Sequence, residues 1–231
     1  MPLLRPDLRE EKALYKQGYR LVAGLDEAGR GSWAGPVVAG AVLLPLGNEG
    51  LEQVLDGVRD SKTLGPSERE RLYAVIQTEA LAVGVGMVPP DQIDELGIVP
   101  ATQEAMALAI AQLFPPPDFL LIDFLRLPLD CPQKSIVHGD ALSLSVAAAS
   151  IVAKVSRDRF MIELDGQYPG YGFASHKGYG TPQHRVALAR LGPSPIHRFS
   201  YAPIRAMMQS RELTAARLSV RPSSRRGLAE V

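Results

Sequence analysis

The sequence is short of cysteines and of long apolar runs, and each shortage excludes a class of protein. Cys131 is the only cysteine among 231 residues, so no disulfide can form within the chain, as is usual in a reducing cytosol. No run of 18 or more apolar residues is present, which argues against a membrane-spanning helix. The first 17 residues are charged and lack the apolar segment of a signal peptide. We therefore expect a cytoplasmic protein that does not enter membranes.

The chain also has no net charge, with 25 Lys and Arg against 25 Asp and Glu. These charges are unevenly distributed along it. Residues 1–140 contain 12 basic and 20 acidic side chains, and residues 141–231 contain 13 basic and 5 acidic ones. Such an asymmetry favours a basic face that contacts phosphate groups. Two solvated faces without a ligand explain it equally well, so charge alone does not identify a partner.

What the sequence does contain is a regular alternation of apolar runs with glycine and proline. This pattern predicts strands at residues 19–25, 36–44, 81–88, 119–123 and 134–137, the first two as a hairpin across a glycine loop. It predicts helices at residues 66–80, 90–96, 101–113, 141–164, 182–191 and 203–214, after a helical or irregular lead-in over 1–17. Three strands followed by strands mixed with helices indicate an α/β fold, in which helices flank a mixed central sheet.

The last third of the chain differs in composition from the rest. From about residue 165 onward it is rich in proline, glycine and aromatic residues, so we expect a small helical appendage packed on the main layers. We therefore expect one domain over residues 1–200. Residues 201–231 should form a helix followed by a basic tail, which is expected to fray because it has little apolar content.

Four acidic side chains stand at strand ends or at a helix start: Asp26, Glu27, Asp123 and Asp140. Carboxylates at the rim of an α/β sheet lie where such folds commonly bind ligands. A cluster of these hard oxygen ligands suits Mg²⁺ or Mn²⁺ and not zinc. Two such ions can activate a water and stabilise the leaving oxygen in phosphodiester hydrolysis.

Each of these acids also has a structural interpretation. Asp26 could begin a turn, and Asp140 could cap the helix that follows it. Asp123 is harder to explain in this way, because an acid directly after Phe-Leu-Leu-Ile is costly to bury without a partner. Neighbouring residues of a strand point to opposite faces. Asp26 and Glu27 can therefore share a site only if the strand has ended or twisted there, which the glycines after them allow.

The segment that follows the first strand is dense in glycine, with Gly29, Gly31 and Gly35 close together. Glycines let the backbone approach a ligand and present its N–H groups. The segment leads into a strand and not into a helix, and it lacks the Gly-Lys-Ser/Thr of a P-loop. An enzyme that binds a nucleotide cofactor here is therefore a weak alternative.

Several segments, in order, resemble the type 2 ribonuclease H family (ribonuclease HII), over roughly residues 19–200. They are Asp-Glu-Ala-Gly-Arg-Gly with Ala-Gly-Pro-Val at 26–37, Asp-Ser-Lys-Thr-Leu at 60–64, Leu-Ile-Asp at 121–123, Gly-Asp at 139–140 with the helix 145–158, and the segments 171–181 and 192–198. Each is moderately specific, and together they are very specific. Two positions depart from the family: Phe124 stands where a glycine is usual, and Ser32-Trp33 is an unusual filling of the glycine loop.

The resemblance implies a ribonuclease H-like fold, with residues 1–200 as the catalytic domain and a substrate-reading segment from about residue 165. It implies that Asp26, Glu27, Asp123 and Asp140 are the catalytic, metal-binding carboxylates and that Mg²⁺ or Mn²⁺ is required, two ions during catalysis. It further implies an endonuclease that cuts the RNA strand of RNA–DNA hybrids and the 5′ side of single ribonucleotides in duplex DNA. The products would carry a 3′-hydroxyl and a 5′-phosphate. We expect a monomer.

The remaining candidate residues would contact the substrate: Gly29, Arg30, Gly31, Lys62, Lys154, Lys177 and Tyr179. RNA differs from DNA at the 2′-hydroxyl, which the backbone of the Gly-Arg-Gly loop could read. The resemblance implies that Tyr179 stacks near the sugar beside the cut, although it could simply be a packed aromatic. The three lysines suit phosphate contacts, and Lys154 could also lie on a solvated helix face. Arg30 could bind phosphate or brace the carboxylates.

Three histidines, His176, His184 and His197, could be taken for acid–base groups. Two-metal hydrolysis needs none, so we interpret them as substrate-side or structural. Two alternative functions stay open at this point. One is a binding module of the same fold that has lost its catalysis, against which the four carboxylates argue. The other is a sister ribonuclease H subtype, which usually carries a long additional N-terminal domain.

Overall fold

The computed structural model describes residues 5–219, and side chains up to residue 210. A five-stranded mixed sheet forms its centre, in the order β3-β2-β1-β4-β5. β1, β2 and β3 are antiparallel, whereas β4 and β5 run parallel to β1. The strands are β1 (Val22–Ala28), β2 (Val37–Leu43), β3 (Ala82–Val88), β4 (Phe119–Asp123) and β5 (Gln133–Ile136). The mixed sheet predicted from the sequence is thus confirmed.

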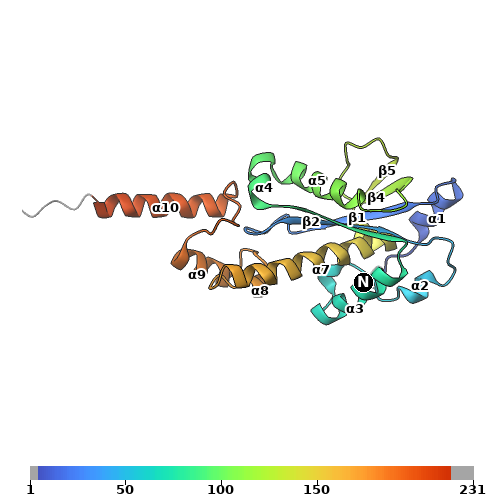
Figure 1. The fold of residues 1–231 in the computed structure, drawn as a ribbon, viewed down its shortest axis with the longest axis horizontal. Helices are drawn as coiled ribbons and strands as arrows, with labels where there is room; N and C mark the ends of the chain where they lie inside the picture. Colours follow the sequence, from blue (N-terminus) through green and yellow to red (C-terminus); the bar gives the residue numbers. More distant parts are fainter. Residues whose placement is uncertain (1–4, 220–231) are drawn as a thin grey trace, which may run out of the picture.

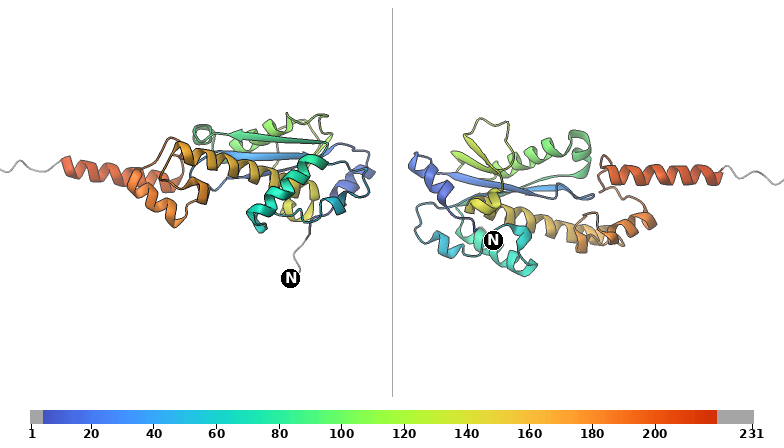
Figure 2. Two further views of the ribbon diagram at one scale, coloured as in Figure 1. Left: turned by 60° about the horizontal axis from the view of Figure 1, so that its bottom comes forward. Right: turned by 180° about the vertical axis from the view of Figure 1, so that it is seen from behind.

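Helices cover both faces of this sheet (Figure 1). The elements before β4 are α1 (Arg9–Lys16), α2 (Leu51–Val54), the 3-10 helix η1 (Ser61–Thr63), α3 (Pro66–Glu79), α4 (Pro90–Leu96) and α5 (Ile98–Ile110). Those after β5 are α6 (Gly139–Leu142), α7 (Leu144–Gln167), α8 (Phe173–His176), α9 (Pro182–Leu191) and α10 (Ala202–Ser219). α4 and α5 lie on one face, α3 and α7 lie on the other, and α10 projects beyond the layers (Figures 1 and 2).

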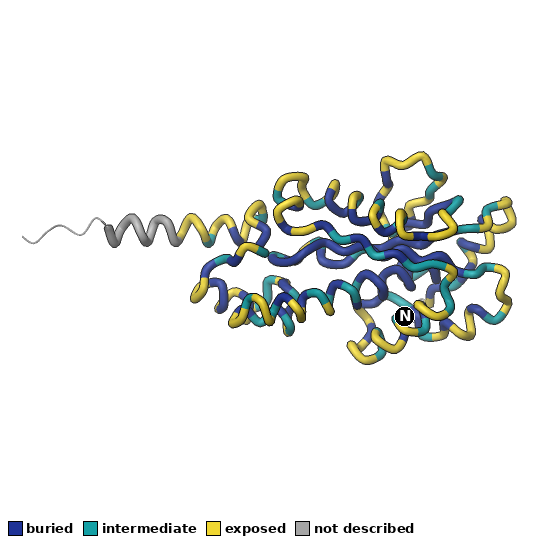
Figure 3. The backbone as a smooth tube through the Cα atoms, viewed as in Figure 1, coloured by how far each residue is buried: buried dark blue, intermediate teal, exposed yellow. Residues whose placement is uncertain are grey.

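The two faces of the sheet carry separate apolar cores. One core joins side chains of the central strands to α5, and the other joins β2 to α3 and α7. The central strands β2, β1 and β4 are almost entirely buried between them, whereas the edge strands β3 and β5 are only partly buried (Figure 3). A third apolar cluster joins the C-terminal half of α7 to α8, α9 and the start of α10. Within the described residues, no helix is long and apolar enough to cross a membrane.

Most of the predicted elements are present, but the helix predicted over 141–164 is in fact two. Ser143 ends α6 in an extended conformation and caps α7, accepting a hydrogen bond from the N–H of Val146. Asp140 lies inside α6, so the interpretation of Asp140 as the cap of the long helix is wrong. Three short helices, α2, η1 and α8, were not predicted because three or four residues are too few for a periodic pattern. The predicted tail over 219–231 lies almost wholly outside the described residues.

Glycines in the strands let the helices approach the sheet closely. A Cβ on Gly24 would lie 2.2 Å from the backbone of Ser145 in α7, and one on Gly40 would lie 2.5 Å from the carbonyl of Ala149. On the other face, a Cβ on Gly86 would lie 1.9 Å from the carbonyl of Ala105 in α5. Since a real Cβ cannot approach so closely, the short distance between the sheet and the helices requires glycine at these positions.

We predict that Gly86→Ala destabilises the protein by about 1–3 kcal/mol or more, because the methyl group must push α5 away from β3. Gly166→Ala in α7 is the matched control. No atom lies within 4 Å of the position that its Cβ would take, so it should be neutral or stabilising by at most about 1 kcal/mol. Urea unfolding measures both changes. Equal stability of wild type and Gly86→Ala would show that the spacing of α5 is not set by this contact.

Candidate active site

The sheet brings the first and third predicted carboxylates side by side. β1 and β4 are parallel, and their last register pair is Leu25 with Ile122. Asp26 and Asp123 are therefore the next residues on two neighbouring strands, at the same rim of the sheet. Asp123 accepts a hydrogen bond from the N–H of Gly139, 2.8 Å away. This bond anchors the start of α6, which carries Asp140.

β1 does not end before its two acids, contrary to the sequence-based expectation. Both belong to the strand, where Asp26 pairs with Gly40 and Glu27 with Ala39. Since strand residues alternate, Asp26 shares its face with Gly24, which contacts α7. Glu27 points to the opposite face. The pairing of β1 with β4 ends before these two residues. Their carboxylates can therefore reach the same end of the sheet from its two faces.

Burial and mutual repulsion set the electrostatics of this rim. Burial, then the charges of Glu27 and Asp123, raise the pKa of Asp26 well above its ordinary value. Burial also raises the pKa of Glu27, although Arg30 at 3.2 Å acts to lower it. Buried like charges of this kind are what a binding or catalytic site accumulates, since ordinary packing would avoid them.

Asp140 completes the group of neighbouring carboxylates, together with Asp60, which was not predicted to be a site residue. Burial raises the pKa of Asp140, and the next contributions are the charges of Asp60 and Asp123. Lys62 is the cation among them, with its Nζ 3.9 Å from Asp140. Burial alone would lower the pKa of Lys62, but Asp26 and the other nearby carboxylates outweigh it and raise that pKa.

The chemistry of this donor set suits a hard divalent cation. Within the described residues no three potential ligand side chains already enclose a single point. Yet Glu27 Oε2 is buried and has no hydrogen-bond partner, and the carboxylates repel one another. A divalent ion would satisfy the unpaired oxygen and offset the repulsion, and carboxylate oxygens are the ligands that Mg²⁺ and Mn²⁺ prefer.

A cleft of about 550 Å³ opens beside the carboxylates. Its lining combines residues from β1, the glycine loop, η1, α5, α7 and the turn after α8: Glu27, Ala28, Gly29, Arg30, Gly31, Ser61, Lys62, Ile98, Lys154 and Tyr179. Of the eleven predicted site residues, this cleft therefore brings together seven. Asp26, Asp123 and Asp140 do not line the cleft but lie next to residues that do: Asp26 and Asp123 act on Glu27 or are acted on by it, and Asp140 lies 3.9 Å from Lys62 Nζ.

Lys177 is the one predicted residue that lies apart from the cleft. It lines an adjoining groove of about 370 Å³, which also includes Lys154. Lys154 is largely buried and forms an ion pair of 2.6 Å with Asp158, so the interpretation of Lys154 as a solvated residue on a helix face is wrong. Tyr179 keeps 37% of its surface exposed and faces Lys154, whose Nζ lies 6.0 Å from its ring centre.

Arg157 fastens the walls of the cleft to α7. Its guanidinium donates to the carbonyls of Ala34 and Pro36 and to the hydroxyl of Ser32. It also donates to the carbonyl of Lys177, beside Tyr179. Arg157 is fully buried, and no carboxylate among the described residues lies within ion-pair distance. The same atoms leave no room for a side chain at Gly29, where a Cβ would lie 2.0 Å from Arg157 Nε.

A second buried arginine holds the Gly-Arg-Gly loop from the other side. Arg198 donates to the carbonyls of Gly35 and Arg30, and the hydroxyl of Tyr201 also donates to Arg30. The carbonyl of Gly29 accepts from Ser32. The carbonyls of Gly29 and Arg30 are thus engaged inside the protein, so at these two residues the loop offers its N–H groups to a ligand.

The two departures from the family have different structural consequences. Trp33 packs against the turn after α8, where a Cβ on Gly180 would lie 2.2 Å from the indole. Phe124 adopts a left-handed conformation with φ of 57°, which glycine adopts without strain and a bulky residue does not. Its ring is 64% exposed. Phe124 therefore carries backbone strain directly after Asp123.

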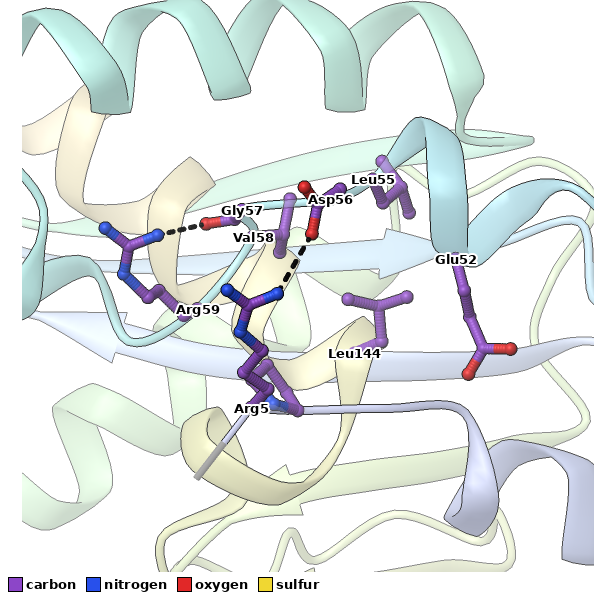
Figure 4. A pocket seen from close by; sticks show the side chains of 9 residues that line it. Arg5, Glu52, Leu55, Asp56, Gly57, Val58, Arg59 and Leu144 are labelled. Carbon is purple, nitrogen blue, oxygen red and sulfur yellow. Dashed lines mark hydrogen bonds and ion pairs between the residues drawn. The ribbon is translucent and has the colours of Figure 1, made fainter. Parts of the chain in front are cut away.

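Another cavity shares no lining residue with the cleft. It measures about 90 Å³ and lies between the N-terminal segment and the loop after α2. Its polar side chains already have partners: Arg5 pairs with Asp56 and Arg59 donates to the carbonyl of Gly57 (Figure 4), and Glu52 pairs with Lys12. None of the predicted site residues lines it.

Sequence reasoning missed four residues that shape the site: Asp60, Arg157, Arg198 and Tyr201. Asp60 begins the Asp-Ser-Lys segment, so its position in a motif was a usable signal. Arg157 and Arg198 also fall in matching segments, but nothing in the sequence indicated that both would be buried. Tyr201 lay outside every segment considered, and no local signal identified it.

Comparisons with known proteins agree with this geometry. The family model for ribonuclease HII matches residues 23–204. A ribonuclease HII of Dehalococcoides mccartyi is 55% identical over 204 residues, which cover 88% of this chain and 95% of the relative. One from Geobacillus kaustophilus is 51% identical and covers 89% and 77%.

Solved structures show the same fold. The ribonuclease H2 of Pyrococcus horikoshii superposes with a TM-score of 0.71 at 29% identity, covering 83% of this chain and 98% of that one. The ribonuclease H-like fold inferred from the sequence is confirmed. With the carboxylate rim, the cleft and the family match together, the chain belongs to the ribonuclease HII family and is a metal-dependent ribonuclease H.

Proposed function

We propose that this ribonuclease H cuts the RNA strand of RNA–DNA hybrids and also cuts on the 5′ side of single ribonucleotides embedded in duplex DNA. The products carry a 3′-hydroxyl and a 5′-phosphate. The observation that carries this proposal is the cleft in which Glu27, the Gly-Arg-Gly loop and Tyr179 face one space. Nucleotide recognition and phosphate hydrolysis can therefore take place on the same bound strand.

Asp26, Glu27, Asp123 and Asp140 hold the divalent ions, Mg²⁺ or Mn²⁺. Two such ions, when bound, activate the attacking water and stabilise the leaving oxygen. The protein contributes carboxylates whose mutual repulsion a cation would relieve, and Lys62 adds a further positive charge beside Asp140. No histidine lines the cleft, which agrees with a hydrolysis that needs no side-chain acid or base.

The loop at Gly29, Arg30 and Gly31 selects a ribonucleotide over a deoxyribonucleotide. The carbonyls of Gly29 and Arg30 are engaged by Ser32, Arg198 and Tyr201, so these residues meet the 2′-hydroxyl with N–H donors. Gly31 has open space where a Cβ would be, which lets the sugar approach the backbone. The ring of Tyr179, on the facing wall, stacks on the neighbouring sugar, and Lys154 and Lys177 contact phosphates.

A cleavage assay tests the proposed activity itself. A duplex that holds one ribonucleotide should be cut by wild type with Mg²⁺ on the 5′ side of that nucleotide. Asp123→Asn should cut at least about 1,000-fold more slowly, because several kcal/mol of transition-state stabilisation by metal is lost. An all-DNA duplex is the control substrate. Absence of cutting under any divalent ion would overturn the proposal, and equal cutting by the variant would overturn the ligand assignment.

The second prediction concerns the metal-free protein. Asp26 has a raised pKa, so its ionised form costs stability in the folded state, and that cost grows as the pH rises through the folded-state pKa. Asp26→Asn removes the charge and keeps the oxygen that accepts from the N–H of Glu27. We expect the variant to be more stable than wild type at pH 7 in EDTA, by about 2–4 °C per kcal/mol relieved.

This gain should disappear below the ordinary pKa of 3.8, where Asp26 is protonated in both states. It should also reverse in Mg²⁺, because only wild type is stabilised by the ion. Thermal unfolding at several pH values measures both effects. Asp130→Asn, at an exposed position, is the control. A less stable Asp26→Asn protein in EDTA would contradict the described electrostatics.

The third prediction concerns phosphate contacts. Affinity for a metal-free duplex should fall steeply with salt, and Lys177→Met should lower the slope of log K against log[salt] by about 0.9 for one lost phosphate contact. Lys134→Met is the control, since Lys134 pairs with Glu10 at 2.6 Å and lies outside the cleft. Fluorescence anisotropy across a salt series measures the slopes. An unchanged slope for Lys177→Met would remove Lys177 from the substrate contacts.

A further inference from the structure

Three buried histidines lie directly behind the wall of the cleft that carries Tyr179. The rings of His176 and His184 stack with their centres 4.4 Å apart, and the Nε2 atoms of His184 and His197 are 3.0 Å apart. All three are buried, and none lines the cleft. They cannot exchange protons with a substrate there, so their role must be sought in what they hold.

The hydrogen bonds of this cluster have only one consistent direction. A backbone carbonyl can only accept, so His184 Nδ1, which lies 3.0 Å from the carbonyl of Tyr179, must carry the proton. If His184 is neutral, its Nε2 is then bare and accepts from the Nε2–H of His197. His197 Nδ1 is left as an acceptor, and it receives the N–H of Ser194 at 2.9 Å and its hydroxyl at 2.8 Å.

The neighbouring contacts agree with this assignment. The carbonyl of Ser194 is 3.2 Å from His197 Nδ1, but it has its own donor in the N–H of His197. His176 makes a separate pair: its Nδ1 accepts from the N–H of Gly178, and its Nε2–H donates to the carbonyl of Tyr171. Burial, then the neighbouring histidines, lower the pKa of His197 to about 4, and burial lowers that of His184 to about 4. Both rings are neutral at pH 7.

The hydrogen bonds that run from Ser194 through His197 and His184 end at the backbone carbonyl of Tyr179. The turn that carries it has positive φ angles at Lys177 and Gly178, of 51° and 80°. Such a turn is not fixed by local preference, because a lysine adopts this conformation only at a cost. The carbonyl of Tyr179 accepts from both His184 Nδ1 and the N–H of Thr181, so a donor from α9 helps to hold the turn.

We propose that His184 is a positioning residue, whose Nδ1–H fixes the carbonyl of Tyr179 and so orients the Tyr179 ring in the cleft, with His197 selecting the tautomer that makes this possible. The inference rests on the proposed substrate role of Tyr179. Ser194, His197, His184 and Tyr179 then form one directed chain, from the loop after α9 to the wall of the substrate cleft.

A matched pair of substitutions separates this role from simple packing. The amide nitrogen of asparagine occupies the level of Nδ1, whereas that of glutamine extends to the level of Nε2. His184→Asn therefore keeps a donor for Tyr179, and His184→Gln loses it. We expect His184→Gln to lower kcat/KM on a duplex with one ribonucleotide about 5–10-fold, the effect of one hydrogen bond. His184→Asn should stay within about 2-fold of wild type by the same measure.

A double-mutant cycle with Tyr179→Ala tests whether His184 acts through Tyr179. If it does, His184→Gln costs nothing further once the Tyr179 ring is absent. An equal loss in both backgrounds would overturn the proposal and leave His184 as a packing residue. If Tyr179→Ala alone cuts as well as wild type, the role of Tyr179 fails, and the positioning role fails with it, while the nuclease activity stands.

A spectroscopic measurement on the wild-type protein does not depend on activity. Imidazole ¹⁵N shifts at pH 7 should show the Nδ1–H tautomer for His184 and the Nε2–H tautomer for His197, with both rings neutral. The reverse tautomers, or a charged ring, would overturn this chain of hydrogen bonds even if every variant folds and cuts as expected. A wild-type protein that shows these tautomers but cuts no duplex would refute the proposed function alone.

Discussion

The buried guanidinium of Arg157 is the interaction on which the substrate side of the molecule depends. It stands on α7 and donates to Ser32, to the start of β2 and to the turn before Tyr179. Burying a charge without a carboxylate partner is costly unless its hydrogen bonds are satisfied. Backbone carbonyls satisfy them here, so any movement of the glycine loop or of the Tyr179 turn would leave a buried charge with missing bonds. The two walls of the cleft are therefore held in one arrangement.

The rim that carries the predicted metal ligands is built on the opposite principle. Asp26, Glu27, Asp123 and Asp140 are held together although their charges disfavour it. The energy needed comes from the sheet and from α7, which pack closely because Gly24 and Gly40 have no side chains. Fixed carboxylates that repel one another would attract a divalent cation, so an unfavourable feature of the fold would favour metal binding.

Departures of the structure from the sequence predictions cluster near these features. Phe124 is strained directly after a carboxylate, Ser143 divides one predicted helix into α6 and α7, and β1 continues through two acids where a strand end was expected. Strain and irregular backbone are common where a site imposes its own geometry. Local patterns describe average behaviour, and they fail where tertiary contacts overrule them.

The sequence by itself determined the strand and helix pattern, the mixed α/β sheet and the family, because apolar periodicity and short motifs depend only on residues close together in the chain. It also indicated four acids as the predicted metal ligands. It also located the glycine loop and Tyr179. Only the tertiary structure decided that β1 continues through Asp26 and Glu27, and that Asp60 lies beside Asp140. It alone brought Arg198 to the carbonyl of Arg30, 168 residues away. Contacts over such separations depend on how helices pack on the sheet, and a local sequence pattern does not predict them.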